Sequence, residues 1–330
     1  MFATDTNFAP ALPTRTGAAR ARGIALPETV DRHSILWPYL LGVVTFHLML
    51  PLAFVPWLFS WTGLLMIPLG NYVFCSLGIG AGFHRLLTHR SYCCPPWLEH
   101  TLAILGICCL QDSPARWVAI HRLHHQHSDA QDDPHSPMVN LFWGHMGWLL
   151  VRNRLLGQMS TYEKYARDVL QDRFYLRLER GRLWVWIYVA HAAMIALIGF
   201  AIGFFSAGTF LGGVQFGLSL LLWGVIFRTL FTWHVTWGVN SMAHLWGYRA
   251  FETDDNSRNN WLFGLLTNGD GWHNNHHGDP RSAAHGQRWW ELDITFLTIC
   301  GLGKLGLLTN IIPPRRSGSS FQPAQPGAID

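Results

Sequence analysis

The chain has 330 residues, of which 49% are hydrophobic and only 13% are charged, with 17 tryptophans. An ordinary soluble domain has about a quarter of its residues charged, so this composition indicates a membrane protein and argues against a disordered, secreted or nucleic-acid-binding chain. The formal net charge of +4 says less than the places where the charges lie.

Two long stretches lack Asp, Glu, Lys and Arg altogether. The first runs from Ser34 to Phe83 and the second from Leu183 to Phe227, over 50 and 45 residues. Because a membrane-spanning helix needs roughly 20 apolar residues, each stretch is long enough for two spans. We therefore expect an all-α integral membrane protein with four transmembrane helices in two hairpins. The predicted spans lie at about 35–57, 61–83, 184–204 and 208–230.

The basic residues predict how these spans are oriented. All 24 Lys and Arg residues lie outside the four spans, and neither hairpin turn, near Ser60 or Ser206, carries one. Basic residues are retained on the cytoplasmic side, so both termini should be cytosolic, with the bacterial inner membrane favoured over the endoplasmic reticulum. The predicted parts are disordered tails at 1–33 and 312–330 around a membrane domain at 34–311, whose cytosolic helical cap is made of 84–182 and 231–311.

Histidines cluster on the cytosolic side of this topology. In the two H-x-x-H-H motifs the imidazoles stand at i, i+3 and i+4, so all three project from one face of a helix. Asn240 and His244 are one turn apart, whereas His84 and His89 would diverge by about 140° on an ideal helix and should reach a metal from a broken or differently angled turn. The nine clustered histidines are His84, His89, His121, His124, His125, His244, His273, His276 and His277.

Nine imidazoles are too many for one metal but suit two metals with four or five ligands each, with Asn240 left to hold a water at one of them. Imidazole binds Zn, Cu, Fe and Ni. We favour two iron ions acting with O2, because the nearest substrates at a bilayer surface are hydrocarbon chains whose C–H bonds need a strong oxidant. No H-E-x-x-H motif of a zinc hydrolase occurs. Of the other histidines, His285 is expected to be a packed residue and His135 to have a structural or supporting role.

Five segments resemble the integral-membrane fatty acyl desaturases of the Δ9 type, and the resemblance runs from about Tyr72 to Ile299. They are GAGFHRLLTHRSY (80–92), WVAIHRLHHQHSD (117–129) followed by DPHS (133–136), WGHMGWLLV (143–151), TWGVNSMAHLWG (236–247) and DGWHNNHH (270–277). Related hydroxylases and ketolases share histidine motifs, but N-S-x-x-H after the fourth span and the form H-N-x-H-H are similar to the acyl desaturase pattern.

The resemblance also implies which residues hold each metal. One metal would take His84, His89, His121, His125 and His276. The other would take His124, His244, His273 and His277, with Asn240 through a water. Asp129 and Asp133 would orient imidazoles through their other ring nitrogen. Asp270 is a weaker candidate for the same role, with an ordinary surface or capping role as the alternative.

An acyl tunnel with a polar entrance is implied as well. Its lining would include Gln111, Trp117, Trp148, Arg152 and Trp237. Asn153 follows Arg152 where acyl-CoA enzymes tend to have a second basic residue, and Asp112 stands where they tend to have Asn. The acyl carrier is therefore open between CoA, a glycerolipid and another group.

The closed end of the tunnel is predicted at Tyr72. This residue lies 12 positions before His84 and so about 18 Å deeper at 1.5 Å per residue, which suits the half of an acyl chain beyond a mid-chain double bond. Cys75 and Ser76 are alternatives about one turn higher. The other role open to Tyr72 is packing between spans with its hydroxyl hydrogen-bonded.

The resemblance implies an enzyme that inserts a cis double bond, expected at Δ9, into a saturated acyl chain with O2 and two electrons. We see no H-P-G-G segment of a fused cytochrome b5, no cysteine cluster for an iron–sulfur centre and no nucleotide fold, so a ferredoxin, cytochrome b5 or reductase should donate the electrons. The alternative enzyme is a hydroxylase or ketolase on the same metals. A histidine-rich metal transporter is the alternative of another class, but it should place ligands inside the bilayer, where only His47 and His191 lie.

Overall fold

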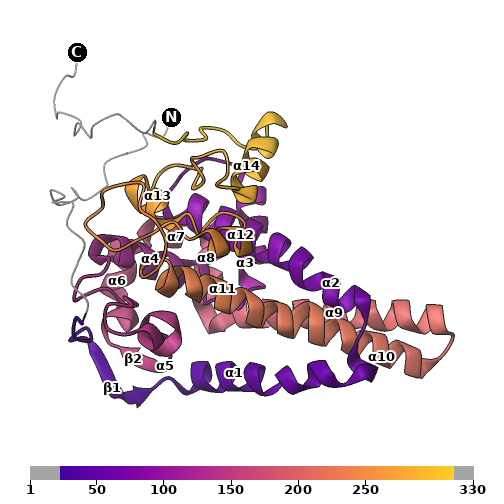
Figure 1. The fold of residues 1–330 in the computed structure, drawn as a ribbon. Coiled ribbons are helices and arrows are strands. Elements are labelled where there is room, and N and C mark those ends of the chain that lie inside the picture. Colours follow the sequence, from indigo (N-terminus) through magenta and orange to yellow (C-terminus); the bar gives the residue numbers. More distant parts are fainter. Residues whose placement is uncertain (1–22, 316–330) are drawn as a thin grey trace.

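A computed structural model describes residues 23–315 of the chain. Long helices extend to one side of the molecule and the short helices gather at the other (Figure 1). The α-helices are α1 (Trp37–Leu48), α2 (Trp61–Gly70), α3 (Pro96–Ile107), α4 (Pro114–His127), α5 (Trp148–Leu150), α6 (Met159–Tyr165), α7 (Arg167–Leu170), α8 (Arg173–Glu179), α9 (Leu183–Ala207), α10 (Phe210–Leu220), α11 (Arg228–Met242), α12 (Trp261–Leu266), α13 (His273–Gly278) and α14 (Ile294–Lys304). The other helical segments are η1 (Leu50–Phe54), η2 (Pro56–Leu58), η3 (Asn71–Thr88), η4 (Trp143–Gly147), η5 (Leu155–Gly157), η6 (Arg180–Arg182) and η7 (Leu221–Phe227).

Four helical stretches among the described residues are long and apolar enough to cross a membrane, which confirms the predicted fold class. They are Trp37–Phe54, Trp61–Thr88, Arg173–Ala207 and Phe210–Met242. The second and fourth run beyond the predicted ends of their spans. This continuation carries His84 and Asn240 on the same rigid helices that enter the apolar region, so the position of both side chains is tied to the spans.

The helix η3 is wound as a π-helix, in which each backbone N–H bonds five residues back instead of four. The His89 N–H donates to the His84 carbonyl at 3.1 Å, and the Thr88 hydroxyl donates to the Phe83 carbonyl at 2.7 Å. Residues five apart thereby come to the same side of the helix. Of the two predicted alternatives, a broken or a differently angled turn, the structure has the second, because a wider winding brings His84 and His89 together.

A close contact between α3 and η3 fixes the helix that carries His84. A Cβ atom added at Gly78 of η3 would lie 2.2 Å from the backbone nitrogen of Gly106 in α3. A Cβ added at Gly106 would lie 2.6 Å from the ring of Phe83, which is fully buried. The two backbones can therefore approach this closely only because both positions lack a side chain.

The predicted tails and the all-α description need a small correction. Residues 30–35, partly inside the predicted tail, form strand β1 (Val30–Ile35), which pairs antiparallel with β2 (Val151–Asn153). At the other end the Ile312 N–H donates to the Ser91 carbonyl at 2.9 Å, so the first predicted tail residues are tied to the cap. Residues 1–22 and 316–330, the outer parts of both predicted tails, lie outside the described residues.

Candidate metal centre

The clustered histidines come from four places in the fold. Helices α4 and α13 carry the two H-x-x-H-H motifs, so each presents three imidazoles from one helix, as predicted. His84 lies in η3 and His89 directly after it. Asn240 lies in α11, but His244 follows the end of that helix at Met242, so the two do not share a helical turn as the sequence suggested.

The nine imidazoles converge in two groups, and within each group one nitrogen of every ring lies within 4.8 Å of the others. Site 1 is formed by His84, His89, His121, His125 and His276. Site 2 is formed by His124, His244, His273 and His277. This division is the one that the resemblance implies. All of these rings are buried except His89 and His125, which are half-buried.

Ring nitrogens of neighbouring imidazoles face each other directly at both sites. In site 1, His276 Nε2 lies 3.0 Å from His84 Nε2 and 2.8 Å from His125 Nε2. In site 2, His273 Nε2 lies 3.0 Å from the Nε2 atoms of both His244 and His277. A neutral imidazole carries one N–H donor and one lone pair, so several Nε2 atoms meeting at one point suit a cation placed among them.

Carboxylates hold the outer ring nitrogens of site 2. The contacts are Asp133 to His124 Nδ1 (3.0 Å), Asp129 to His244 Nδ1 (2.8 Å) and Asp255 to His277 Nδ1 (2.6 Å). An Nδ1–H donor bound to a carboxylate fixes the tautomer and turns the Nε2 lone pair inward. The sequence suggested Asp129 and Asp133 but missed Asp255, which lies in a loop 22 residues before its partner and carries no motif.

Site 1 has a different outer support. Among the described residues, the one carboxylate that contacts a site 1 imidazole is Asp270, whose Oδ1 atom lies 3.7 Å from His84 Nδ1. The same oxygen lies 3.1 Å from Arg85 Nη1 and 3.1 Å from His285 Nδ1. His285 is fully buried, as expected of a packed residue, but it packs against Asp270 and was not recognised in the sequence as part of the site.

Burial and the carboxylates set the protonation of these rings in the metal-free protein. Burial alone would lower the pKa of His244, but the Asp129 carboxylate outweighs it and raises that pKa to about 9. Burial lowers the pKa of His277 to about 4 in spite of Asp255. It also lowers the pKa of His121 and of His276 in site 1 well below the usual range. A proton therefore sits on His244 in site 2, and a metal must displace it.

Unpartnered nitrogens mark both sites as suitable for a metal. The Nε2 atoms of His89 in site 1 and of His124 in site 2 are buried and have no hydrogen-bond partner among the described residues. Leaving a buried polar atom unpaired costs free energy, and a cation at the focus of each group removes that cost. A donor set made only of imidazoles fits Zn, Cu, Fe or Ni.

A cavity of about 970 Å³ connects the imidazoles with the ends of the first and third spans. Its lining includes His84, His121, His273 and Asn240. It also includes Trp37, the first residue of α1, and Trp184, near the start of α9. This volume lies at the upper end of the range that small-molecule sites occupy, so an apolar molecule in the cavity can reach the metal centre.

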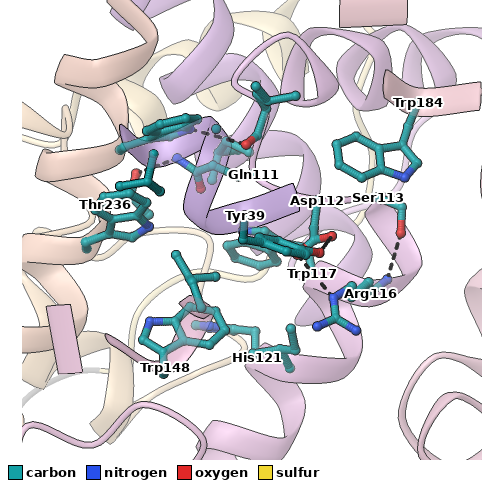
Figure 2. A pocket seen from close by; sticks show the side chains of 18 of the residues that line it. Tyr39, Gln111, Asp112, Ser113, Arg116, Trp117, His121, Trp148, Trp184 and Thr236 are labelled. Carbon is teal, nitrogen blue, oxygen red and sulfur yellow. Dashed lines mark hydrogen bonds and ion pairs between the residues drawn. The ribbon is translucent and has the colours of Figure 1, made fainter. Parts of the chain in front are cut away.

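Five of the six predicted substrate contacts line this cavity. They are Gln111, Trp117, Trp148, Arg152 and Trp237. Gln111 and Thr236 face each other across one side of the cavity, and the Gln111 side-chain amide donates to the Thr236 hydroxyl at 3.0 Å (Figure 2). This hydrogen bond holds both side chains in place in the cavity wall.

The sixth predicted contact, Tyr72, does not line the cavity. Its hydroxyl lies 2.9 Å from the Thr298 hydroxyl of α14, so it packs between helices with its polar atom satisfied. Cys75 and Ile79 of the same helix line the cavity instead. The prediction fails because it rested on the rotation of an ideal α-helix, whereas η3 is wound more widely.

The sequence missed a polar cluster in the cavity wall. The Tyr39 hydroxyl donates to Asp112 Oδ1 at 2.6 Å, and Arg116 Nε donates to Asp112 Oδ2 at 3.1 Å. Figure 2 shows these three side chains together in the wall of the cavity. The carboxylate of Asp112, noted in the sequence as a departure, therefore balances the charge of Arg116.

Comparisons with known proteins agree with this arrangement. The family described as "Fatty acid desaturase" matches residues 55–298. The chain is 36% identical over 296 residues to the sn-2 palmitoyl-lipid 9-desaturase of Nostoc sp., covering 89% of this chain and 96% of that protein. It is 37% identical over 292 residues to the sn-1 stearoyl-lipid 9-desaturase of Synechocystis sp. (88% and 85%) and 37% identical over 262 residues to the acyl-CoA C20 Delta5-desaturase of Anemone leveillei (79% and 77%).

Proposed function

The chain belongs to the fatty acid desaturase family, and on that premise we propose that it inserts a cis double bond at the Δ9 position of a saturated acyl chain, using O2, two iron ions and two electrons from a separate redox protein. One –CH2–CH2– unit, one O2, two electrons and two protons give one –CH=CH– unit and two water molecules. The acyl chain is oxidised, and O2 takes up its two hydrogens together with the added electrons and protons.

The observation that carries the proposal is the position of the two histidine groups at one end of an apolar cavity. His84 and His121 of site 1 and His273 of site 2 line that cavity, so a chain lying in it passes next to both groups. When bound, the two iron ions supply the activation of O2 that an unactivated C–H bond requires. In this proposal, Asn240 in the cavity wall holds a water at site 2.

The remaining residues position the acyl chain and exclude water. Trp117 stacks on the His121 ring with centroids 4.9 Å apart, and this indole screens the site 1 side of the path. The hydrogen-bonded Gln111 and Thr236 give the wall a fixed contour beside the imidazoles. A rigid wall fixes the position of the acyl chain, so that one pair of carbons faces the oxidant. The rate also depends on this positioning, because a displacement of about 1 Å can cost roughly 100-fold.

For the acyl carrier we propose a membrane glycerolipid instead of CoA. Trp37, Trp184 and Trp186 line the cavity near the first residues of α1 and α9, and tryptophans are enriched at membrane interfaces. The Asp112 carboxylate balances the charge of Arg116, which leaves less positive potential for the phosphates of CoA. Relatives at similar identity are named for lipid-linked and for CoA-linked chains. Purified protein given labelled glycerolipid in vesicles should desaturate it faster than labelled acyl-CoA, and the reverse order would contradict the proposal.

For the topology we propose that both chain ends and the histidines face the cytosol, as the basic residues predict. Reporter tags at residues 1, 160 and 330 should then be cytosolic, and tags near residues 60 and 206 should lie on the opposite side. A tag at 160 that reports the same side as one at 60 would contradict this orientation.

The proposal is tested by fatty-acid profiling of cells that express the chain in a host without its own Δ9 desaturase. Monounsaturated acids with the bond at carbon 9 should accumulate, and His124→Ala and His276→Ala should each abolish them while the protein remains in the membrane. Hydroxy or keto acids would instead indicate the alternative enzyme, and a bond at another carbon would correct the position. Purified protein made with ample iron should contain two irons per chain. Zinc alone in such material would contradict the iron assignment.

A further inference from the structure

Beside each site lies a trio made of one of its candidate ligands, a carboxylate and a buried histidine that belongs to neither group of clustered imidazoles. At site 1 the trio is His84, Asp270 and His285, and at site 2 it is His124, Asp133 and His135. His285 and His135 are both almost completely buried, with 0% and 2% of their surface exposed. The two trios look alike, but the carboxylates in them are held differently.

In the site 2 trio the carboxylate is held by the backbone. Asp133 Oδ2 accepts from the Asp129 N–H at 2.8 Å, and Asp133 Oδ1 accepts from the His135 N–H at 3.1 Å. Both oxygens also lie 3.0 Å from His124 Nδ1. The side chain of His135 contributes little, because its Nδ1 lies 3.9 Å from Asp133. Asp133 thus keeps its position whatever side chain stands at residue 135.

In the site 1 trio the carboxylate depends on side chains. Asp270 Oδ1 has the guanidinium of Arg85 and the ring of His285 as its nearest neighbours, both at 3.1 Å, and reaches His84 only at 3.7 Å. The His285 ring also packs against the rings of His84 and His276, with centroids 5.0 and 4.5 Å away. Its Nε2 atom is buried and has no hydrogen-bond partner among the described residues. His285 therefore fills the space beside Asp270 and these two imidazoles and keeps Asp270 against His84.

We infer that the two sites hold their metals unequally, and that Asp270, kept against His84 by the buried side chain of His285, is the support on which retention of metal at site 1 depends. The inference rests on both histidine groups being metal sites, as proposed above. His285 is a positioning residue in this view, because it keeps Asp270 in place and packs against the rings of His84 and His276.

The charges around the two sites support a stronger hold on the metal at site 2 than at site 1. Three carboxylates contact site 2 imidazoles directly, and the groups around Asp129 and Asp255 are hydroxyl and backbone N–H donors as well as the imidazoles. The carboxylate beside site 1 is a single one and already faces a guanidinium. Removing a carboxylate partner from a ligating histidine typically costs about 10- to 100-fold in metal affinity. Site 2, with three such partners, should keep its metal longer in spite of having one imidazole fewer.

The experiment measures metal release from the purified holoprotein. Protein loaded anaerobically with Fe(II) to two irons per chain is mixed with an excess of a strong iron chelator, and released iron is followed over time. We expect two phases of one iron each, with rates that differ by at least about 10-fold. Asp129→Asn should speed the slow phase, which assigns that phase to site 2. Release of both irons in one phase would overturn the inference.

A matched pair of variants tests the role of His285. His285→Gln should speed the fast phase by about 10-fold or more and leave the slow phase unchanged, whereas His135→Gln should leave both phases unchanged. The backbone at residue 285 is held independently, since its N–H donates to Asp293 and its carbonyl accepts from Asn275. An unchanged fast phase in His285→Gln, or an equal effect of His135→Gln on the slow phase, would overturn the inference.

A second variant and a measurement of iron content make this test decisive. If His285→Gln fails to fold, Asp270→Asn tests the same support with the side-chain shape retained, and an unchanged fast phase in that variant would overturn the inference. Iron content before the chelator is added separates the two proposals. Protein that binds fewer than two irons contradicts the metal centre itself, whereas two irons released together contradict only the inequality.

Discussion

The length of the acyl chain that the cavity accepts should be set by Cys75. This side chain is 2% exposed and lies nine residues before His84 on η3, so it lies deeper in the span than the imidazoles. Trp233 of α11 and Val43 of α1 line the same cavity. A larger side chain at residue 75 takes up cavity volume deeper in the span than the metal centre.

The size of the effect follows from the volume added. Cys75→Leu adds two heavy atoms, which take the room of about two methylene groups. Burial of two methylene groups is worth about 1.6 kcal/mol at about 0.8 kcal/mol each, which corresponds to about a 15-fold change in relative kcat/KM. The variant should therefore shift the preference from C18 toward C16 chains by about that factor.

The assay is competition between C16, C18 and C20 chains on the same carrier, with the products resolved by length and by the position of the double bond. The bond position counted from the carboxyl end should stay fixed, because Cys75 lies beyond the metals. Tyr72→Phe is the matched control, since it removes the hydrogen bond to Thr298 on the same helix and should leave the length preference unchanged. An unchanged C18 to C16 ratio in Cys75→Leu with activity retained, or a shifted ratio in Tyr72→Phe, would refute the reasoning.

Two further outcomes concern protonation and packing. Below pH 9 a metal entering site 2 must displace the Nε2 proton of His244, which the Asp129 carboxylate stabilises from the other side of the ring. The affinity of the metal-free protein for Zn²⁺ should therefore rise from pH 6 to about 9. This slope should flatten in Asp129→Asn, and an equal slope in both proteins would contradict the assignment. Gly78→Val should lower the thermal unfolding midpoint by an amount equivalent to roughly 1–3 kcal/mol or more, because its Cβ would lie 2.2 Å from the α3 backbone. Gly42→Ala, whose Cβ meets nothing within 4 Å, is the control, and equal midpoints for the two variants would contradict the packing argument.

The sequence predicts best what depends on composition and regular spacing. Four spans follow from the absence of charge over long stretches, since the bilayer requirement acts on every residue of a span. The grouping of His121 and His125 apart from His124 is implied by the family resemblance, and the helical spacing at i, i+3 and i+4 agrees with it. The structure places these rings in the two groups that the motifs and the family resemblance imply.

What the sequence missed depends on backbone register and on contacts between distant segments. The π-helical winding of η3 depends on which carbonyl each backbone N–H bonds, and no residue type in the sequence indicates this. The winding brings His84 and His89 together and turns Tyr72 away from the cavity. Asp255 and His285 reach the sites through loops whose course is set by packing. Neither residue belongs to a histidine motif, so only the folded chain reveals what they touch.

The two H-x-x-H-H helices divide their imidazoles in opposite senses. On α4 the i and i+4 rings, His121 and His125, join site 1 and the i+3 ring joins site 2. On α13 the i and i+4 rings, His273 and His277, join site 2 and the i+3 ring joins site 1. These two helices therefore supply three imidazoles to each site, and the sites would be equivalent if nothing else contributed. The spans make the groups differ, because η3 and the residue after it add His84 and His89 to site 1, while the segment after α11 adds only His244 to site 2. We expect the carboxylates to outweigh this difference, since three of them contact site 2 imidazoles, whereas Asp270 is the one that contacts site 1 among the described residues.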